Sequence, residues 1–88
     1  MKISRSTRKG KKWMAEFKDG TITHFGATGY DDYTLGTSDA QRKSYIARHS
    51  NENHTNPKTA GTLSRYILWE HRSMDNAIRK YKKRFGIK

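Results

Sequence analysis

The fold is indicated first by residues 12–25, which read KWMAEFKDGTITHF. Two runs of β-prone residues flank Asp19-Gly20, and a two-residue Asp-Gly turn between such runs is a strong signal for a β-hairpin. The register of that turn pairs Lys18 with Thr21 and Phe17 with Ile22. The more apolar face of the hairpin then carries Trp13, Ala15, Phe17, Ile22 and His24. We expect this face to meet the rest of the domain, with His24 as a hydrogen-bonded polar group in the core.

Three helices are predicted after the hairpin, each preceded by a residue that can cap a helix. Ser38 forms a capping box with Gln41 and begins a helix that runs to about His49. Thr59 begins the second helix, and Ser73 begins the third. The second helix has apolar residues on much of its girth. The third carries an apolar stripe at 3.6-residue spacing, formed by Met74, Ala77, Ile78, Tyr81 and Phe85.

The fold class that follows is α+β, an N-terminal β-hairpin packed on three α-helices. The glycine-punctuated segment after the hairpin leaves room for a short third strand at Tyr33–Leu35. Residues 1–12, rich in Lys, Arg, Ser and Thr, are predicted to be a basic N-terminal arm. Residues 13–88 are predicted to be one α+β domain with a basic C-terminal helix that ends at Gly86.

The net charge of +11 lies entirely in the two ends of the chain. Residues 1–12 and residues 79–88 each carry six Lys or Arg and no acid, whereas residues 13–78 hold seven Lys or Arg against eight Asp or Glu. Clustered cations repel one another unless a polyanion offsets them. The pattern therefore favours nucleic acid as the partner. The phosphate-contacting residues that it predicts are Arg5, Arg8, Lys9, Lys11, Lys12, Arg79, Lys80, Lys82, Lys83 and Arg84.

Other chemistries find little support in the sequence. The chain has no cysteine, so disulfides and thiolate metal sites are excluded. The histidines fit no closed zinc pattern, and we expect no metal, cofactor or small-molecule substrate. One alternative is a nuclease that uses His49, His54 and the pair Asp31 and Asp32. No apolar run approaches the length of a membrane span.

The aromatic residues are expected to divide between core and surface. Trp13, Tyr81 and Phe85 are needed inside so small a domain. Tyr30 and Tyr33, in the glycine-punctuated loop, are the candidates for stacking on nucleic-acid bases. The run Lys80–Arg84 also has the composition of a nuclear-import signal, which would be compatible with phosphate contact.

Five segments together resemble a family of small basic proteins of large DNA viruses of algae and protists. They are His24-Phe25-Gly26, Gly29–Thr34, Arg48-His49, Lys58–Trp69 and Tyr81–Phe85. The connection Asn51–Asn56 departs from the pattern because it lacks a tryptophan. The resemblance brings no activity and therefore no catalytic residue. It implies a virion protein, present in the host cytoplasm or nucleus during infection.

The leading hypothesis is a non-enzymatic virion protein that binds nucleic acid, DNA in the first place, without strong sequence preference. The alternative is a minor capsid or cementing protein whose basic ends contact acidic surfaces of neighbouring capsid subunits. Virions of this kind contain basic proteins of both sorts. Binding of short DNA at low salt and the location of the protein in opened virions distinguish the two.

Overall fold

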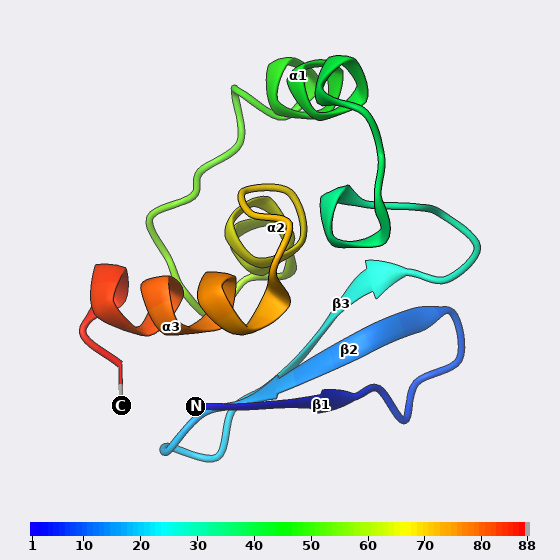
Figure 1. The fold of residues 1–88 in the computed structure, drawn as a ribbon. Coiled ribbons are helices and arrows are strands. Elements are labelled where there is room, and N and C mark those ends of the chain that lie inside the picture. The colour runs from blue at the N-terminus through cyan, green and yellow to red at the C-terminus, as the bar shows by residue number, and fades with distance from the viewer. Residues whose placement is uncertain (88) are drawn as a thin grey trace.

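The computed structural model describes residues 1–87, and in these residues a three-stranded antiparallel sheet precedes three α-helices (Figure 1). This arrangement confirms the α+β class. Lys88, the last residue of the expected domain, lies outside the described residues. The elements are β1 (Lys2–Arg5), β2 (Lys11–Glu16), β3 (Ile22–Ala27), a 3₁₀ turn η1 (Tyr33–Leu35), α1 (Asp39–Arg48), α2 (Ala60–Leu63), a π-helical segment η2 (Ser64–Leu68) and α3 (Met74–Phe85).

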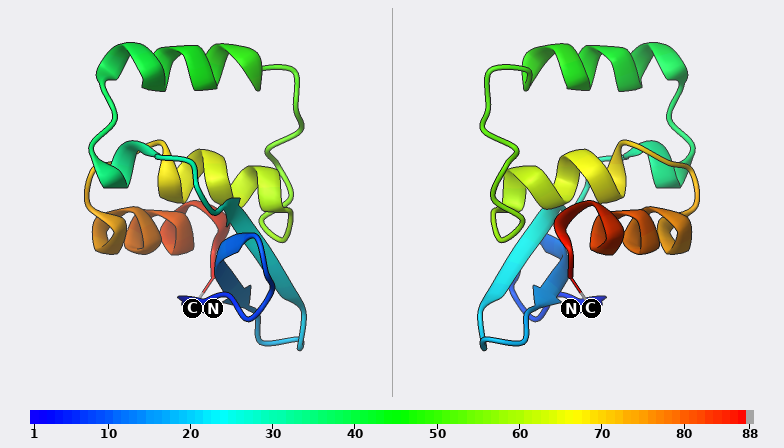
Figure 2. Two further views of the ribbon diagram at one scale, coloured as in Figure 1. Left: turned by 90° about the vertical axis from the view of Figure 1, so that its right-hand side faces the viewer. Right: turned by 90° about the vertical axis from the view of Figure 1, so that its left-hand side faces the viewer.

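The helix formed by α2 and η2 lies at the centre of the molecule. It packs against β3 on one side and against α3 on another. Helix α1 lies on the side of this central helix that faces away from the sheet, in all the views (Figures 1 and 2). Helix α1 buries none of its own residues. The core therefore belongs to the sheet, the central helix and α3, and α1 is an outer element.

The expected N-terminal arm is in part a strand of the sheet. Residues Lys2–Arg5 form β1 and pair antiparallel with β2, with Ile3 opposite Ala15. Ile3 packs against the buried cluster, and its pairing satisfies backbone groups of β2 that would otherwise form a bare edge. The predicted boundary between an N-terminal arm and the domain at residue 12 is therefore wrong. The prediction rested on the Lys and Arg content of residues 1–12, which does not show that their backbone pairs with β2.

The third strand of the sheet is thus β1 and does not lie at Tyr33–Leu35. That segment is the 3₁₀ turn η1. The side chain of Asp32 accepts a hydrogen bond from the backbone N–H of Thr34 (2.9 Å), and Gly36 ends the turn with a left-handed φ of 97°. A capped start and a glycine end favour a tight turn over an extended strand.

The hairpin between β2 and β3 forms where it was predicted, but its register is shifted by one residue. Trp13 lies opposite Phe25, and Glu16 lies opposite Ile22. The backbone N–H of Phe17 donates to the carbonyl of Thr21 (2.9 Å), so the loop holds three residues instead of two. Its last residue, Gly20, has a φ of 92°, as in three-residue hairpin loops with a glycine bulge.

A shift of one residue exchanges the two faces of a strand. Phe25, predicted to be on the outer face, is fully buried, whereas Ile22, predicted to be inside, is 54% exposed. The expectation for His24 is wrong for the same reason. Its ring Nδ1 lies 2.7 Å from the hydroxyl of Ser6, and the side chain is only half-buried.

The helix starts agree with the predictions. Ser38 and Gln41 form both hydrogen bonds of the capping box. Thr59 and Ser73 each accept a hydrogen bond from the backbone N–H three residues on. Gly86 ends α3 with a φ of 64°. These features depend on residues close together in the chain, and local patterns report them well.

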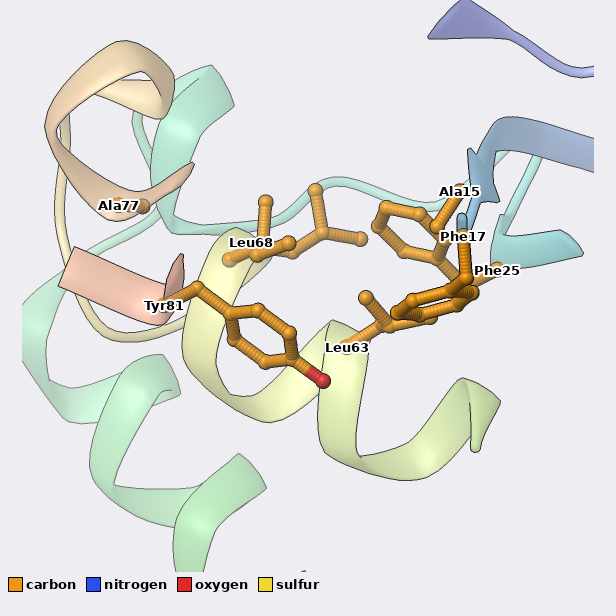
Figure 3. Packing of buried hydrophobic residues seen from close by; sticks show 8 residues of the cluster. Ala15, Phe17, Phe25, Leu63, Leu68, Ala77 and Tyr81 are labelled. Carbon is orange, nitrogen blue, oxygen red and sulfur yellow. The ribbon is translucent and has the colours of Figure 1, made fainter. Parts of the chain in front are cut away.

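The core is one cluster in which side chains from β2 and β3 meet the central helix and α3 (Figure 3). The hydroxyl of Tyr81, at the centre of this cluster, donates a hydrogen bond of 2.5 Å to the carbonyl of Pro57. Burial raises the pKa of Tyr81 well above its ordinary value. The buried apolar residues are Ala15, Phe17, Phe25, Leu63, Ile67, Leu68, Ala77 and Tyr81. Trp13 and Phe85, both expected inside, pack against this cluster while remaining partly exposed.

Candidate nucleic-acid interface

The ten cations predicted to contact phosphates form two separate regions. The first region surrounds the loop between β1 and β2 and contains Arg5, Arg8, Lys9, Lys11 and Lys12. The second lies on α3 and contains Arg79, Lys80, Lys82, Lys83 and Arg84. The β1–β2 loop and the carboxyl end of α3 lie on opposite sides of the molecule (Figure 1). We call them the loop region and the helix region.

These ten cations differ in ion pairing from the cations of residues 13–78, the body of the protein. In the body, Arg42 and Arg65 pair with Glu70, while Lys58 and Arg72 pair with aspartates. Within residues 1–87, Lys12 is the only one of the ten end cations that has a carboxylate partner. The remaining nine carry positive charge that the described part of the chain leaves unneutralised, as a polyanion-binding surface requires.

The loop region contains a small pocket of about 320 Å³. Three of its lining residues are cations, Arg5, Lys11 and Lys12, against one acid, Asp32. Its other lining residues are Ser6, Trp13, Thr28, Thr34 and Leu35. The guanidinium of Arg5 lies 5.5 Å from the centre of the Trp13 ring. Cationic groups beside hydroxyl donors form a surface that suits a phosphate oxygen.

Lys12 has a structural role that its position in the basic run does not reveal. Its ammonium group donates to Oδ2 of Asp32 (2.8 Å) and to the backbone carbonyl of Tyr30. The side chains of Asp32 and Lys12 are 3% and 16% exposed. Lys12 therefore neutralises a buried carboxylate, and we no longer count it among the phosphate-contacting residues.

The helix region presents its cations on the side of α3 that faces away from the core. Ala77 and Tyr81 are buried, whereas Lys80 and Lys83 are exposed. Two of the arginines have neutral partners: Arg79 donates to the side-chain oxygen of Asn76 (2.6 Å), and the guanidinium of Arg84 lies 4.2 Å from the centre of the Tyr66 ring. Neither contact removes charge, so both side chains keep their attraction for phosphate.

The two tyrosines proposed for base stacking differ in availability. Tyr30 is 73% exposed. Two guanidinium groups lie over the ring of Tyr33: that of Arg72 is 4.0 Å and that of Arg42 is 5.3 Å from the ring centre. Its hydroxyl also donates to Asp39 (2.7 Å). Tyr30 remains a candidate for stacking, while Tyr33 is already engaged within the protein.

The residues of the nuclease alternative are brought only partly together. Nδ1 of His49 forms a short contact with Glu52, and Nε2 of His54 lies 3.6 Å from the other oxygen of the same carboxylate. The hydrogen bond with His49 holds the pKa of Glu52 below its ordinary value. Asp31 and Asp32 line the same cleft as His49. Within residues 1–87 no group of three or more His, Asp or Glu side chains is arranged to hold a metal ion.

A second network, around Glu70, holds α1 in place. Burial alone would raise the pKa of Glu70, but the hydrogen bond from Arg65 and the charges of Arg65 and Arg42 lower it below its ordinary value. Arg42 also donates through Nε to the carbonyl of Trp69 (2.8 Å).

Among the helices of residues 1–87, none is long and apolar enough to cross a membrane.

Residues 1–49 match the model of a family of unknown function (DUF5754), and because these residues are more than half of the 88, the chain belongs to that family. No curated protein matches the chain, and no solved structure matches it. The family description assigns no activity.

Some residues of the candidate interface were not predicted from the sequence. The hydroxyl side chains of Ser6, Thr28 and Thr34 line the basic pocket, although they come from three different segments. No short-range pattern marks them, because only the folded sheet brings these segments together. A larger cleft beneath α1, described below, was missed for the same reason.

Proposed function

We propose that this chain is a non-enzymatic virion protein of a large DNA virus that binds nucleic acid without strong sequence preference. The observation that carries the proposal is the contrast in ion pairing between the body and the ends. Nine cations in two regions have no carboxylate partner within residues 1–87, while four of the body's cations do. The viral setting comes from the resemblance of the five sequence segments described above.

The contacts that we infer are with the phosphate backbone. Arg5, Arg8, Lys9 and Lys11 act from the loop region, and the five cations of α3 act from the helix region. Phosphate contacts give affinity without base recognition. Because the two regions lie on opposite sides of the molecule (Figure 1), one protein can hold two separate stretches of duplex. Such bridging compacts a genome.

Salt dependence of duplex binding tests the phosphate contacts. If about six phosphates are neutralised, the slope of log K against log salt is roughly −5. The double variant Arg8→Gln/Lys9→Gln removes two charges from the loop region, and Lys80→Gln/Lys83→Gln removes two from the helix region. Each double variant is expected to make the slope less steep by about 2. A flat salt response of the unaltered protein contradicts the proposal.

The matched control removes the same charge from the body of the protein. Lys18 and Lys43 are exposed and have no ion-pair partner within residues 1–87. Lys18→Gln/Lys43→Gln is expected to leave the slope within experimental error of the original. If it reduces the slope as much as the other two double variants, binding reflects net charge alone and the two regions have no special role.

A minor capsid role is the second candidate, and the nine end cations without a carboxylate partner within residues 1–87 are equally compatible with it. In this role the basic regions contact acidic surfaces of capsid subunits. Fractionating opened virions decides between the two: recovery with the genome supports nucleic-acid binding, and recovery with the shell supports the capsid role.

A further inference from the structure

A large cleft separates α1 from the centre of the molecule. Its volume is about 980 Å³, within the range of pockets that bind small molecules. One wall is α1, with Gln41, Ser44, Tyr45 and Arg48; the opposite wall is the central helix, and the loop after β3 closes one end. Helix α1 buries no residue of its own. Two contacts with Trp69 hold it over the cleft: Arg42 donates through Nε to the carbonyl of Trp69, and the ring of Tyr45 stacks on the indole.

The chemistry of this cleft differs from that of the basic pocket. Its lining contains three Lys or Arg and three Asp or Glu, so its formal charge is balanced when His49 is neutral. Lys12 pairs with Asp32, and His49 contacts Glu52. A balanced interior does not attract phosphate. The cations Lys11 and Arg48 remain without a carboxylate partner within residues 1–87.

The cleft also presents aromatic surface. The rings of Tyr45 and Trp69 both line it and are stacked on each other, with centres 4.3 Å apart and planes inclined by 6°. The ring of Tyr45 also contacts that of His49, with centres 4.3 Å apart, so Tyr45 is already engaged within the protein. Tyr30 lines the cleft as well and is 73% exposed, so its ring is open to a ligand. Aromatic side chains beside a basic rim are the arrangement by which proteins hold the bases of single-stranded nucleic acid.

The lining of the cleft also carries neutral polar side chains. Gln41, Ser44 and Ser64 supply hydrogen-bond donors and acceptors. Together they can recognise the polar edge of a planar heterocycle.

We propose that this cleft receives an unpaired nucleobase of a single-stranded segment, a proposal that rests on the proposed nucleic-acid binding. The base stacks on the exposed ring of Tyr30 and bonds through its edge to the hydroxyl and amide groups. Its flanking phosphates meet Lys11 and Arg48. Because Lys11 lines both the cleft and the basic pocket, the strand continues from the cleft into the loop region.

The experiment compares ligands that differ in bases but share the same number of phosphates. The full chain is titrated with a ten-nucleotide oligothymidylate, with an abasic strand of the same length, and with a ten-base-pair duplex. We expect the oligothymidylate to bind about tenfold more tightly than the abasic strand at the same salt, as for one stacked base. Tyr30→Leu is expected to reduce this ratio to below about threefold and to leave duplex binding unchanged.

A matched control and a second variant of the cleft keep the test decisive. Tyr33→Leu is the control, because it removes a tyrosine of the same loop that does not line the cleft, and it should leave the ratio intact. Ser44→Ala removes an exposed hydroxyl from the cleft lining and should reduce the ratio by about threefold.

The possible failures are distinguishable. Equal affinity for the oligothymidylate and the abasic strand overturns the cleft proposal, and a steep salt dependence with both would leave the phosphate contacts standing. If the base-containing strand binds while the abasic strand and the duplex do not, the cleft proposal holds and the proposed phosphate contacts fail. Absence of binding to all three ligands overturns both.

Discussion

Replacing Lys12 by methionine tests whether this lysine stabilises the fold, as its contacts with the buried Asp32 indicate. Met keeps the length and much of the apolar stem but removes the charge. The carboxylate of Asp32, 3% exposed, would then keep only its two hydrogen bonds from Thr34. Removing one partner of a buried ion pair costs about 3–5 kcal/mol. Because the Thr34 bonds remain, we expect about 3 kcal/mol.

A loss of about 3 kcal/mol is large for a chain of this size, whose total free energy of unfolding is about 4–13 kcal/mol. With a urea m-value of about 1–1.5 kcal/mol/M for a small domain, the midpoint of urea unfolding should fall by about 2–3 M. Circular dichroism at pH 7 measures it. Lys11→Met is the matched control, since Lys11 has no carboxylate partner within residues 1–87, and its midpoint should stay within about 0.5 M of the original.

A second substitution shows whether the buried charge causes the loss. Asp32→Asn keeps the side-chain oxygen that caps η1 but removes the charge, so Lys12→Met/Asp32→Asn should be more stable than Lys12→Met alone. The reasoning is refuted if Lys12→Met unfolds at the same urea concentration as Lys11→Met. It is also refuted if the double variant is less stable than Lys12→Met.

Three further predictions concern stability. The lowered pKa of Glu70 contributes stability that is complete above its unfolded pKa of about 4.3 and is lost as pH falls through the folded pKa. Glu70→Gln should therefore flatten the dependence of the urea midpoint on pH between about 5 and 3. An unchanged slope would contradict this expectation. Gly26→Ala should cost about 2–3 kcal/mol of stability, because φ is +80° and the new Cβ would meet a buried leucine methyl at 3.0 Å. Gly29→Ala, with a φ of +84° and open space around it, should cost about 1 kcal/mol. Equal losses of stability in thermal melts would exclude a steric clash at Gly26. Ile22→Thr should change stability by less than about 0.5 kcal/mol, whereas Phe25→Ala should cost about 3 kcal/mol or more. A larger loss for Ile22→Thr than for Phe25→Ala would support the register of a two-residue turn instead.

The register of the hairpin shows where reasoning from the sequence reaches its limit. Asp19-Gly20 correctly located the turn, but the same dipeptide fits a two-residue loop and the end of a three-residue loop. The two choices differ by one residue and place opposite faces of the strand inside. Burial of Phe25 against the central helix decides between them, and that contact joins residues far apart in the chain.

For the candidate interface as well, one part could be predicted from the sequence and another part depends on the fold. The charge contrast between ends and body is a property of composition, and the structure places these cations in two regions. Which of them are free depends on contacts across the fold: Lys12 and Asp32 are 20 positions apart, and nothing local distinguishes Lys12 from Lys11. The cleft beneath α1 has no sequence signature, because its walls come from four separate segments.

The sequence by itself determined the α+β class, the starts of the helices and the concentration of positive charge at both ends. Capping bonds, helical periodicity and charge act over a few residues, so they can be read without the fold. Only the tertiary structure decided that residues 2–5 complete the sheet, which face of β3 is buried, and which lysine neutralises Asp32. Each of these depends on pairing or burial between distant segments, whose free energy exists only once the chain has folded.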